Sequence, residues 1–586
     1  MKRFSILLIL LAVTGPLRAD TATDEAFQNL ADEYLSELPS LSPVYATLVG
    51  DHRADARLDE VDEQARTEAV ELLREYEAAL EALDFDELSR ANQVDAALLL
   101  QNVRSNLWST VVLQEWAWNP LYYVQLSGSA IYALLARDFA PLEQRLDSAA
   151  SRLEQMPRFL AQARDALQPA RVPKIHAETA IQQAPGLGSI IDNMILPHME
   201  ELPAARAERL EAAIETARDA IADYQTWLEQ ELLPRAEGDF RIGAELYDAK
   251  LAFALDSPLS RKEIKARAEL EYQQVRNRMY AVAKTVYLEK FPMTAFPDNP
   301  DEAYKQAIIR AALEEAYKAL PPRDGIVEVA RQQLQEATDF VIEQNIVTMP
   351  EEPVEIIIMP EFQRGVSVAY LDPPGPLDED QPAFYAVAPL PEDWTESQVQ
   401  SFLREYNLYS LQDLTIHEGV PGHYLQLALS NRYPSTLRSV LWSGPFVEGW
   451  AVYAEQMMIE AGYQDNDPLQ RLITLKWYLR AVTNAIIDSA IHVDGMSREE
   501  AMKLMVEGGF QEEREAAGKW VRAQLTSAQL STYFVGYQEH IEMRAAVERA
   551  WGDEFTLRRY HDAALSFGSP PVKYVRALIL DEPIPR

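Results

Sequence analysis

Cysteine is absent from the sequence, and histidine is scarce, at eight of 586 residues. Without cysteine the chain can form no disulfide bond, so its folded state depends on packing alone. Positive charge is also scarce: 54 Lys and Arg residues stand against 92 Asp and Glu residues, which gives a formal net charge of −38. This balance excludes nucleic-acid binding, which needs a basic surface, and it disfavours binding to anionic membranes.

Two further absences narrow the classes of function. The sequence has no Gly-x-Ser-x-Gly segment, so it gives no support for a serine hydrolase built on that turn. The apolar run at residues 4–13 is too short to span a bilayer, and it follows Lys2 and Arg3 as in a secretory signal. We expect cleavage after Ala19 and a periplasmic or secreted protein without a stable membrane anchor. Because no cysteine follows the run, we expect no lipid attachment.

The remaining composition, 48% hydrophobic and 25% charged, is that of a large globular protein with room for two or more lobes. The spacing of apolar residues predicts helices over most of the chain. Three short β-branched and aromatic segments predict a small sheet, at 354–359, 366–371 and 384–387. We predict a mainly α, two-lobed fold with this sheet next to a central active-site cleft. The predicted regions are a signal peptide (1–19), an N-terminal helical lobe (20–347) and a catalytic region (348–586).

The most informative stretch is His417-Glu418-Gly419-Val420-Pro421-Gly422-His423, which lies between predicted helices at 396–418 and 423–430. Neutral imidazole is the commonest protein ligand for transition metals. On an undistorted helix, two residues six apart point about 120° away from each other. Pro421 and Gly422 predict a break between the helices, which would let both histidines face one ion. The alternative is an ordinary Pro-Gly helix break flanked by two structural histidines.

A third ligand is available in the next predicted helix, at 446–461. Glu448 lies 31 residues after His417, in the first turn of that helix, and Glu455 follows two turns later on the same face. Two histidines and one carboxylate with an open fourth position form a common catalytic zinc site. We predict Glu448 as the ligand, with Glu455 as the alternative or as a hydrogen-bond partner of a ligating histidine.

These motifs resemble those of a bacterial family catalogued as domain of unknown function 885. The resemblance rests on the 417–426 segment and on Glu-Gly-Trp-Ala-Val-Tyr-Ala-Glu at 448–455, and it covers most of the chain. Supporting matches occur at 358–360, 369–374, 488–492, 533–536 and 567–568. The family is regarded as similar to the helical gluzincin peptidases, which include thimet oligopeptidase, angiotensin-converting enzyme and carboxypeptidase Taq.

The resemblance implies a zinc metallopeptidase with one Zn²⁺ per chain and a short or extended peptide, or a small amide, as its substrate. Glu418 would be the general base, and His417, His423 and Glu448 would hold the metal. By analogy with the helical peptidases, Tyr533 and His492 would stabilise the oxyanion. The predicted substrate contacts are Arg544, which would grip a carboxylate, with Tyr370 and Gln426.

Two other functions remain open at this point. One is a metal-dependent amidase or esterase acting on a non-peptide substrate, which sequence patterns do not distinguish from a peptidase. The other is a catalytically silent peptide-binding protein. The presence of Glu418 argues against the silent protein, because a pure binder has no need of a general base.

Overall fold

The computed structural model describes residues 22–359, 368–378, 380–391 and 394–586. The predicted signal peptide therefore lies outside the described residues. Within them the protein is mainly α-helical with one three-stranded sheet, as the sequence predicts. No helix in these ranges is both long enough and apolar enough to cross a membrane.

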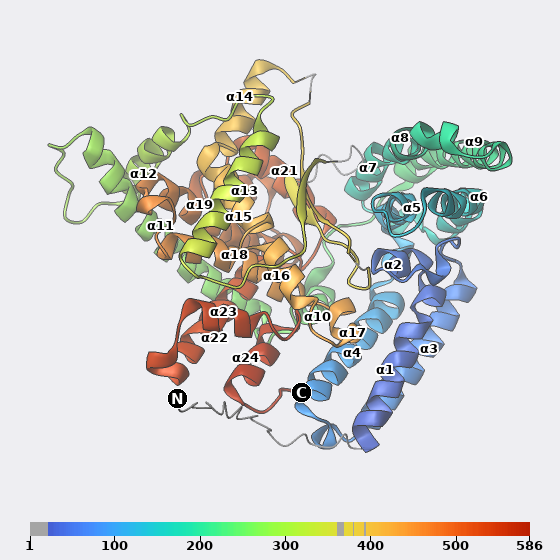
Figure 1. The fold of residues 1–586 in the computed structure, drawn as a ribbon. Coiled ribbons are helices and arrows are strands. Elements are labelled where there is room, and N and C mark those ends of the chain that lie inside the picture. Colours follow the sequence, from blue (N-terminus) through green and yellow to red (C-terminus); the bar gives the residue numbers. More distant parts are fainter. Residues whose placement is uncertain (1–21, 360–367, 379, 392–393) are drawn as a thin grey trace, which may run out of the picture.

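The N-terminal helices occupy one side of the molecule (Figure 1). They are α1 (Ala22–Leu41), α2 (Pro43–Leu48), α3 (Glu63–Glu81), α4 (Arg90–Trp108), α5 (Pro120–Leu135), α6 (Leu142–Ala166), α7 (Lys174–Gln183), α8 (Pro185–Ile190) and α9 (Ala204–Trp227). The helix α5 begins where Asn119 caps it and Pro120 opens its first turn.

Four long helices and the sheet follow. They are α10 (Gly243–Leu255), α11 (Arg261–Lys290), α12 (Glu302–Ala316), α13 (Ile326–Glu343), β1 (Val354–Ile358), β2 (Ala369–Asp372) and β3 (Ala383–Val387). The strand order is β1-β3-β2, with β1 parallel and β2 antiparallel to β3. The sheet lies between the N-terminal helices and the C-terminal ones, next to α15 (Figure 1). The predicted second strand begins at residues 366–367, which are outside the described part.

The C-terminal region is again helical. Its helices are α14 (Glu396–Glu405), α15 (Leu408–Glu418), α16 (His423–Ser430), α17 (Thr436–Val440), α18 (Gly444–Glu460), α19 (Pro468–Ser489), α20 (Arg498–Met502), α21 (Glu513–Leu525), α22 (Ser531–Trp551), α23 (Leu557–Ala564) and α24 (Val572–Leu580). The predicted single helix at 396–418 is wrong. Asn407 interrupts it, because its side chain accepts hydrogen bonds from the N–H groups of Tyr409 and Ser410 and so starts α15 anew.

The division between the lobes lies earlier than the predicted residue 347. Buried residues from Val44 to Leu232 form one core among the N-terminal helices. The buried residues of α10–α13, such as Met279 and Leu313, instead share a core with α15, α18, α19 and α22. The packing of their apolar faces therefore places residues from about 243 onward in the C-terminal lobe. This grouping depends on long-range contacts and not on local sequence.

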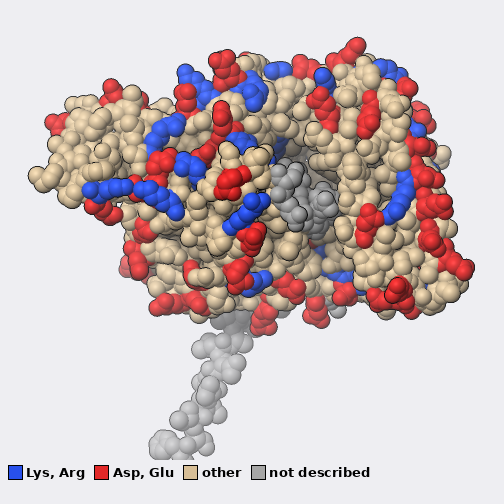
Figure 2. Space-filling model, turned by 90° about the horizontal axis from the view of Figure 1, so that it is seen from above, with Lys and Arg blue, Asp and Glu red and all other residues tan. Residues whose placement is uncertain are grey.

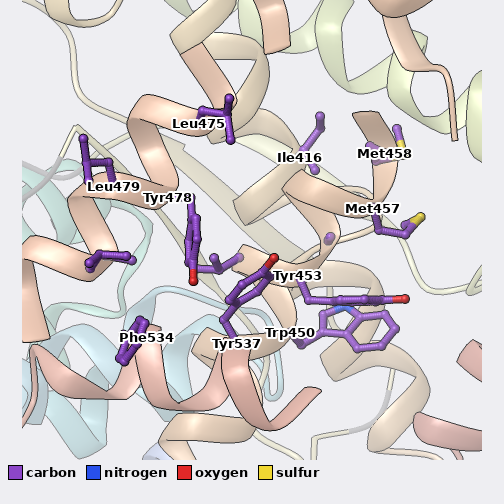
Figure 3. Close-up of a cluster of buried hydrophobic side chains, with 14 of the residues drawn as sticks. Ile416, Trp450, Tyr453, Met457, Met458, Leu475, Tyr478, Leu479, Phe534 and Tyr537 are labelled. Carbon is purple, nitrogen blue, oxygen red and sulfur yellow. The ribbon is translucent and has the colours of Figure 1, made fainter. Parts of the chain in front are cut away.

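The centre of this larger core is aromatic. It includes Ile416 of α15 with Trp450 and Tyr453 of α18, and Tyr478 of α19 packs against Tyr537 of α22 with ring centroids 4.5 Å apart (Figure 3). Each of these side chains is buried. Since large aromatic groups bury much apolar surface in fixed geometry, this core holds the four helices in register.

Two glycines set the distance between α18 and α22. A Cβ atom on Gly536 would lie 1.9 Å from the carbonyl oxygen of Pro445, and one on Gly449 would lie 2.2 Å from the carbonyl carbon of Gly536. The helix backbones therefore touch at this crossing. Glu448 immediately precedes one glycine, and Tyr533 lies one turn before the other, so the contact also fixes these two side chains relative to each other.

Gly536→Ala is expected to destabilise the protein by about 2–3 kcal/mol or more, because the added methyl group overpacks a rigid backbone contact. Gly518→Ala is the matched control: it also lies within a helix, but its Cβ would meet nothing within 4 Å. It should stabilise by about 0.5–1 kcal/mol through the lost flexibility of glycine. Chemical denaturation measures both, and equal stability of the two variants would contradict the close crossing.

Candidate metal centre

A tight turn brings the two histidines together. Helix α15 ends at Glu418, the Val420–Pro421 peptide bond is cis, and α16 begins at His423. A Cβ on Gly422 would lie 2.0 Å from the carbonyl oxygen of His417, so only glycine fits there. The indole N–H of Trp450, on α18, donates to the Pro421 carbonyl at 2.8 Å. The predicted helix break between the histidines is confirmed.

The histidines and Glu448 form one cluster. The His417 Nε2 and His423 Nε2 atoms lie 3.7 and 3.5 Å from Glu448 Oε2, and the three donor atoms all lie within 4.8 Å of one another. Around a tetrahedral zinc ion with bonds of about 2.0–2.1 Å, neighbouring donor atoms are about 3.3–3.4 Å apart. The donor set and its spacing therefore fit one such ion.

Electrostatics keep Glu448 ready to act as a ligand. Burial raises the pKa of its carboxyl group, but the hydrogen bonds and charges of His417 and His423 outweigh burial and hold that pKa well below its usual value. The Glu448 side chain remains 23% exposed, whereas each histidine side chain is 11% exposed. Solvent or a small ligand can therefore approach the cluster on the Glu448 side.

Glu455 lies outside the cluster and contacts His417 on the ring nitrogen that faces away from Glu448. Its Oε1 accepts a hydrogen bond from His417 Nδ1 at 2.6 Å, which directs His417 Nε2 toward Glu448. Buried Asp413, one helical turn before His417, accepts hydrogen bonds from Thr474 and Gln470. Burial raises the pKa of both acids; the charge of Glu455 further raises the pKa of Asp413, and the charge of Glu418 further raises that of Glu455. Of the two carboxylates left open by the sequence, Glu448 lies within the cluster of possible metal donors, and Glu455 lies outside it and bonds His417.

Glu418 lies beside the histidines and contacts the sheet. Its Oε2 accepts a hydrogen bond from the backbone N–H of Leu371, in β2, at 2.9 Å. Burial raises the pKa of this carboxyl group, and the nearby histidines oppose that effect. Glu418 is not one of the three clustered donors, so a metal ion held by those donors would leave its carboxylate unligated.

Tyr533 borders the cluster and is joined to a residue that the sequence analysis missed. Burial raises the pKa of its hydroxyl group, and the charge of Glu448 raises it further. Arg522, on α21, donates from Nη2 to the Tyr533 hydroxyl at 3.1 Å. The two residues are 11 positions apart on different helices, so no local spacing reveals the pair. Asp413 was detectable, because it precedes His417 by four residues on one helix.

The predicted role of His492 is wrong. Its ring nitrogens contact three backbone carbonyl oxygens, at 3.2 Å to Phe240 and 2.8 Å to Ala523 and Thr526, and its ring stacks on Tyr247. It is buried and ties α19 to neighbouring segments. Both of its ring nitrogens are engaged by the protein itself, so it has no free donor for an oxyanion.

Two of the three predicted substrate contacts are also wrong. Gln426 is fully buried, and its amide donates to the hydroxyl groups of Ser430 and Ser569. Arg544 pairs with Glu460 at 2.9 Å, and it lies 11 residues beyond Tyr533, about 16 Å along α22. Tyr370 keeps a place near the centre, because it precedes Leu371, the residue that binds Glu418.

Glu448→Ala is expected to abolish metal binding at this cluster, whereas Glu455→Ala should weaken it by about 10–100-fold, the usual effect of losing a partner that orients a ligand. Equilibrium dialysis against zinc, with both variants shown to be folded by circular dichroism, measures the two affinities. The reverse order of effects would make Glu455 the ligand.

The fold and the cluster together define a large helical protein that presents a two-histidine, one-carboxylate centre between α15, α16 and α18. The chain belongs to the family described as "Bacterial protein of unknown function (DUF885)", whose model matches residues 43–579. No curated protein matches it.

Two solved structures are similar over nearly their whole length. One is a candidate lipoprotein of unknown function from Shewanella oneidensis, 32% identical, with a TM-score of 0.78 over 94% of this chain and 99% of that chain. The other is a candidate lipoprotein from Colwellia psychrerythraea, 19% identical, with a TM-score of 0.77 over 95% of this chain and 100% of that chain. The second likeness concerns the fold alone.

Proposed function

We propose that this protein is a zinc-dependent hydrolase, most simply a peptidase. The observation that carries the proposal is the position of Glu418, a buried carboxylate beside a cluster whose donor set and spacing fit zinc. A zinc ion held by His417, His423 and Glu448 would supply a Lewis acid for a carbonyl oxygen and lower the pKa of a bound water.

The chain's own residues would then divide the remaining work. Glu418 accepts the proton of the attacking water and passes it to the leaving amine, while the Leu371 N–H holds its carboxylate in place. The Tyr533 hydroxyl, on the Glu448 side, donates to the oxygen on which negative charge develops. One such donor contributes about 3–4 kcal/mol of transition-state stabilisation.

The sheet favours a peptide as the substrate. In the described residues β2 pairs only with β3, so β2 is an edge strand, and Leu371 on it touches Glu418. An extended peptide can pair with an exposed strand edge and so place its own backbone beside the catalytic carboxylate. The surface is hollowed between the N-terminal helices and the rest of the molecule (Figure 2), and acidic side chains are spread over both sides.

We also propose that the protein works outside the cytoplasm. Its amino-terminal residues have the pattern of a secretory signal, and two proteins with the same fold are described as candidate lipoproteins. The metal-dependent amidase or esterase and the silent peptide-binding protein remain the alternatives.

A substrate panel separates these functions. The purified protein, supplied with zinc, is expected to cleave members of a quenched-fluorescence peptide library, and a chelator should stop the cleavage. Cleavage of non-peptide amides or esters alone would favour the amidase or esterase. Peptide binding without any turnover would favour the silent binder.

A further inference from the structure

Helix α21 carries two basic side chains that form no ion pair with a carboxylate among the described residues. Lys519 and Arg522 are three residues apart and so share one helix face. Within the described ranges, no Asp or Glu oxygen lies within 4.0 Å of either side chain. Lys519 is only 5% exposed. Buried cations normally have a paired anion, and this chain has a large excess of acidic residues, so the missing partner is notable.

The acids closest to this pair are already engaged. Glu515 binds Arg480 and accepts a hydrogen bond from the Tyr406 hydroxyl at 3.1 Å. Glu405 accepts from Lys476 at 2.9 Å and from a backbone N–H at 3.0 Å. Burial lowers the pKa of Lys519 well below its usual value, and the charges of Arg480 and Arg522 lower it further. Glu515 and Glu405 oppose this shift without forming an ion pair with Lys519, so the charged form of Lys519 lacks a directly bonded anion.

The pair adjoins the candidate metal centre through Tyr533. Within the described residues, the Arg522 side chain donates two hydrogen bonds from Nη2, to the Tyr533 hydroxyl and to Gln529 Oε1, each at 3.1 Å. Its Nε and Nη1 donors have no hydrogen-bond acceptor among the described residues. The charge of Glu448 reaches both Tyr533 and Arg522. The free donors thus belong to a side chain that is bonded to Tyr533 and on which the charge of Glu448 acts.

We propose that Arg522, assisted by Lys519, is the subsite for a substrate carboxylate, and that the preferred substrates are peptides cleaved near a free C-terminus. This inference rests on the proposed peptidase function and assigns the role that the sequence analysis gave to Arg544. A guanidinium group binds a carboxylate through two parallel hydrogen bonds, a geometry that a neutral amide does not reproduce. A bound carboxylate would supply the anion that the pair lacks.

The test measures binding without turnover, by calorimetry on zinc-loaded protein in a Glu418→Gln background. The probes are N-acetyl-trialanine, its C-terminal amide, and N-acetyl-Ala-Glu-Ala amide, which carries its only carboxylate on a side chain. The free acid is expected to bind about 10–100-fold more tightly than either amide, the usual range for charge-assisted hydrogen bonds. Adding Arg522→Gln should remove this preference and leave the affinity for the trialanine amide unchanged.

Two further variants separate the subsite from its surroundings. Arg514→Gln removes an exposed cation from the same helix and should keep the preference. Tyr533→Phe removes the hydroxyl group bonded to Arg522 and should also keep it, because the free donors of Arg522 remain. Lys519→Met should reduce the preference by less than Arg522→Gln.

Equal binding of acid and amide, no binding of either, or a preference that survives Arg522→Gln would each overturn the subsite. Tighter binding of the Glu-containing amide than of the free acid would assign Arg522 to acidic side chains and overturn C-terminal cleavage. A preference for the acid in a protein that hydrolyses no peptide would retain the subsite and reject the peptidase. Hydrolysis of acid and amide substrates at equal rates by the wild-type protein would retain the peptidase and reject the subsite.

Discussion

Glu418→Gln is expected to lower peptide hydrolysis by at least about 10²–10⁴-fold, the contribution of a positioned acid–base group. The expected loss comes from proton transfer alone. Glutamine has nearly the size of glutamate, and its amide oxygen can still accept the hydrogen bond from Leu371. It is unable, however, to take a proton from water or to give one to a leaving amine. Zinc content should stay near normal, since Glu418 is outside the donor cluster.

The measurement compares initial rates on a quenched peptide with the metal content of the same preparations. Glu499→Gln is the matched control, because Glu499 is an exposed carboxylate on α20 and its loss should leave the rate unchanged. If Glu418→Gln hydrolyses peptides as fast as the wild type, another group is the base. If its zinc is lost as well, Glu418 supports the metal and the division of roles is wrong.

The donor set was predictable because its signals are local. Pro421 has no N–H to donate to the His417 carbonyl and Gly422 weakens a helix, so the break between His417 and His423 follows from local covalent geometry. The choice between Glu448 and Glu455 was harder, since both lie on one helix face. In the structure Glu448 lies within the donor cluster, whereas Glu455 lies outside it and bonds His417 Nδ1.

The remaining roles depended on contacts between distant segments. By sequence alone, His492 and Gln426 are polar residues on helix faces. In the structure, the His492 ring contacts carbonyl groups more than 30 residues away, and the Gln426 amide donates to Ser569. Arg522 had no motif around it at all. Secondary structure was mostly predictable from periodicity, whereas the assignment of α10–α13 to the C-terminal core required packing that no local pattern encodes.

His417→Ala and His423→Ala are each expected to lose most of the bound zinc and essentially all hydrolytic activity. Each removes one of three protein ligands, and the two that remain do not complete the usual catalytic set. His198→Ala is the matched control: this histidine is 38% exposed and pairs only with Glu201 among the described residues, so the variant should retain metal and activity.

The most direct measurement is the zinc content of purified wild type, His417→Ala and His198→Ala, each assayed for peptide hydrolysis in the same preparation. We expect about one zinc per chain in the wild type and in His198→Ala, with activity proportional to zinc. In His417→Ala we expect little zinc and no measurable cleavage. Full zinc content and undiminished hydrolysis in His417→Ala would contradict a zinc-dependent hydrolase built on this cluster.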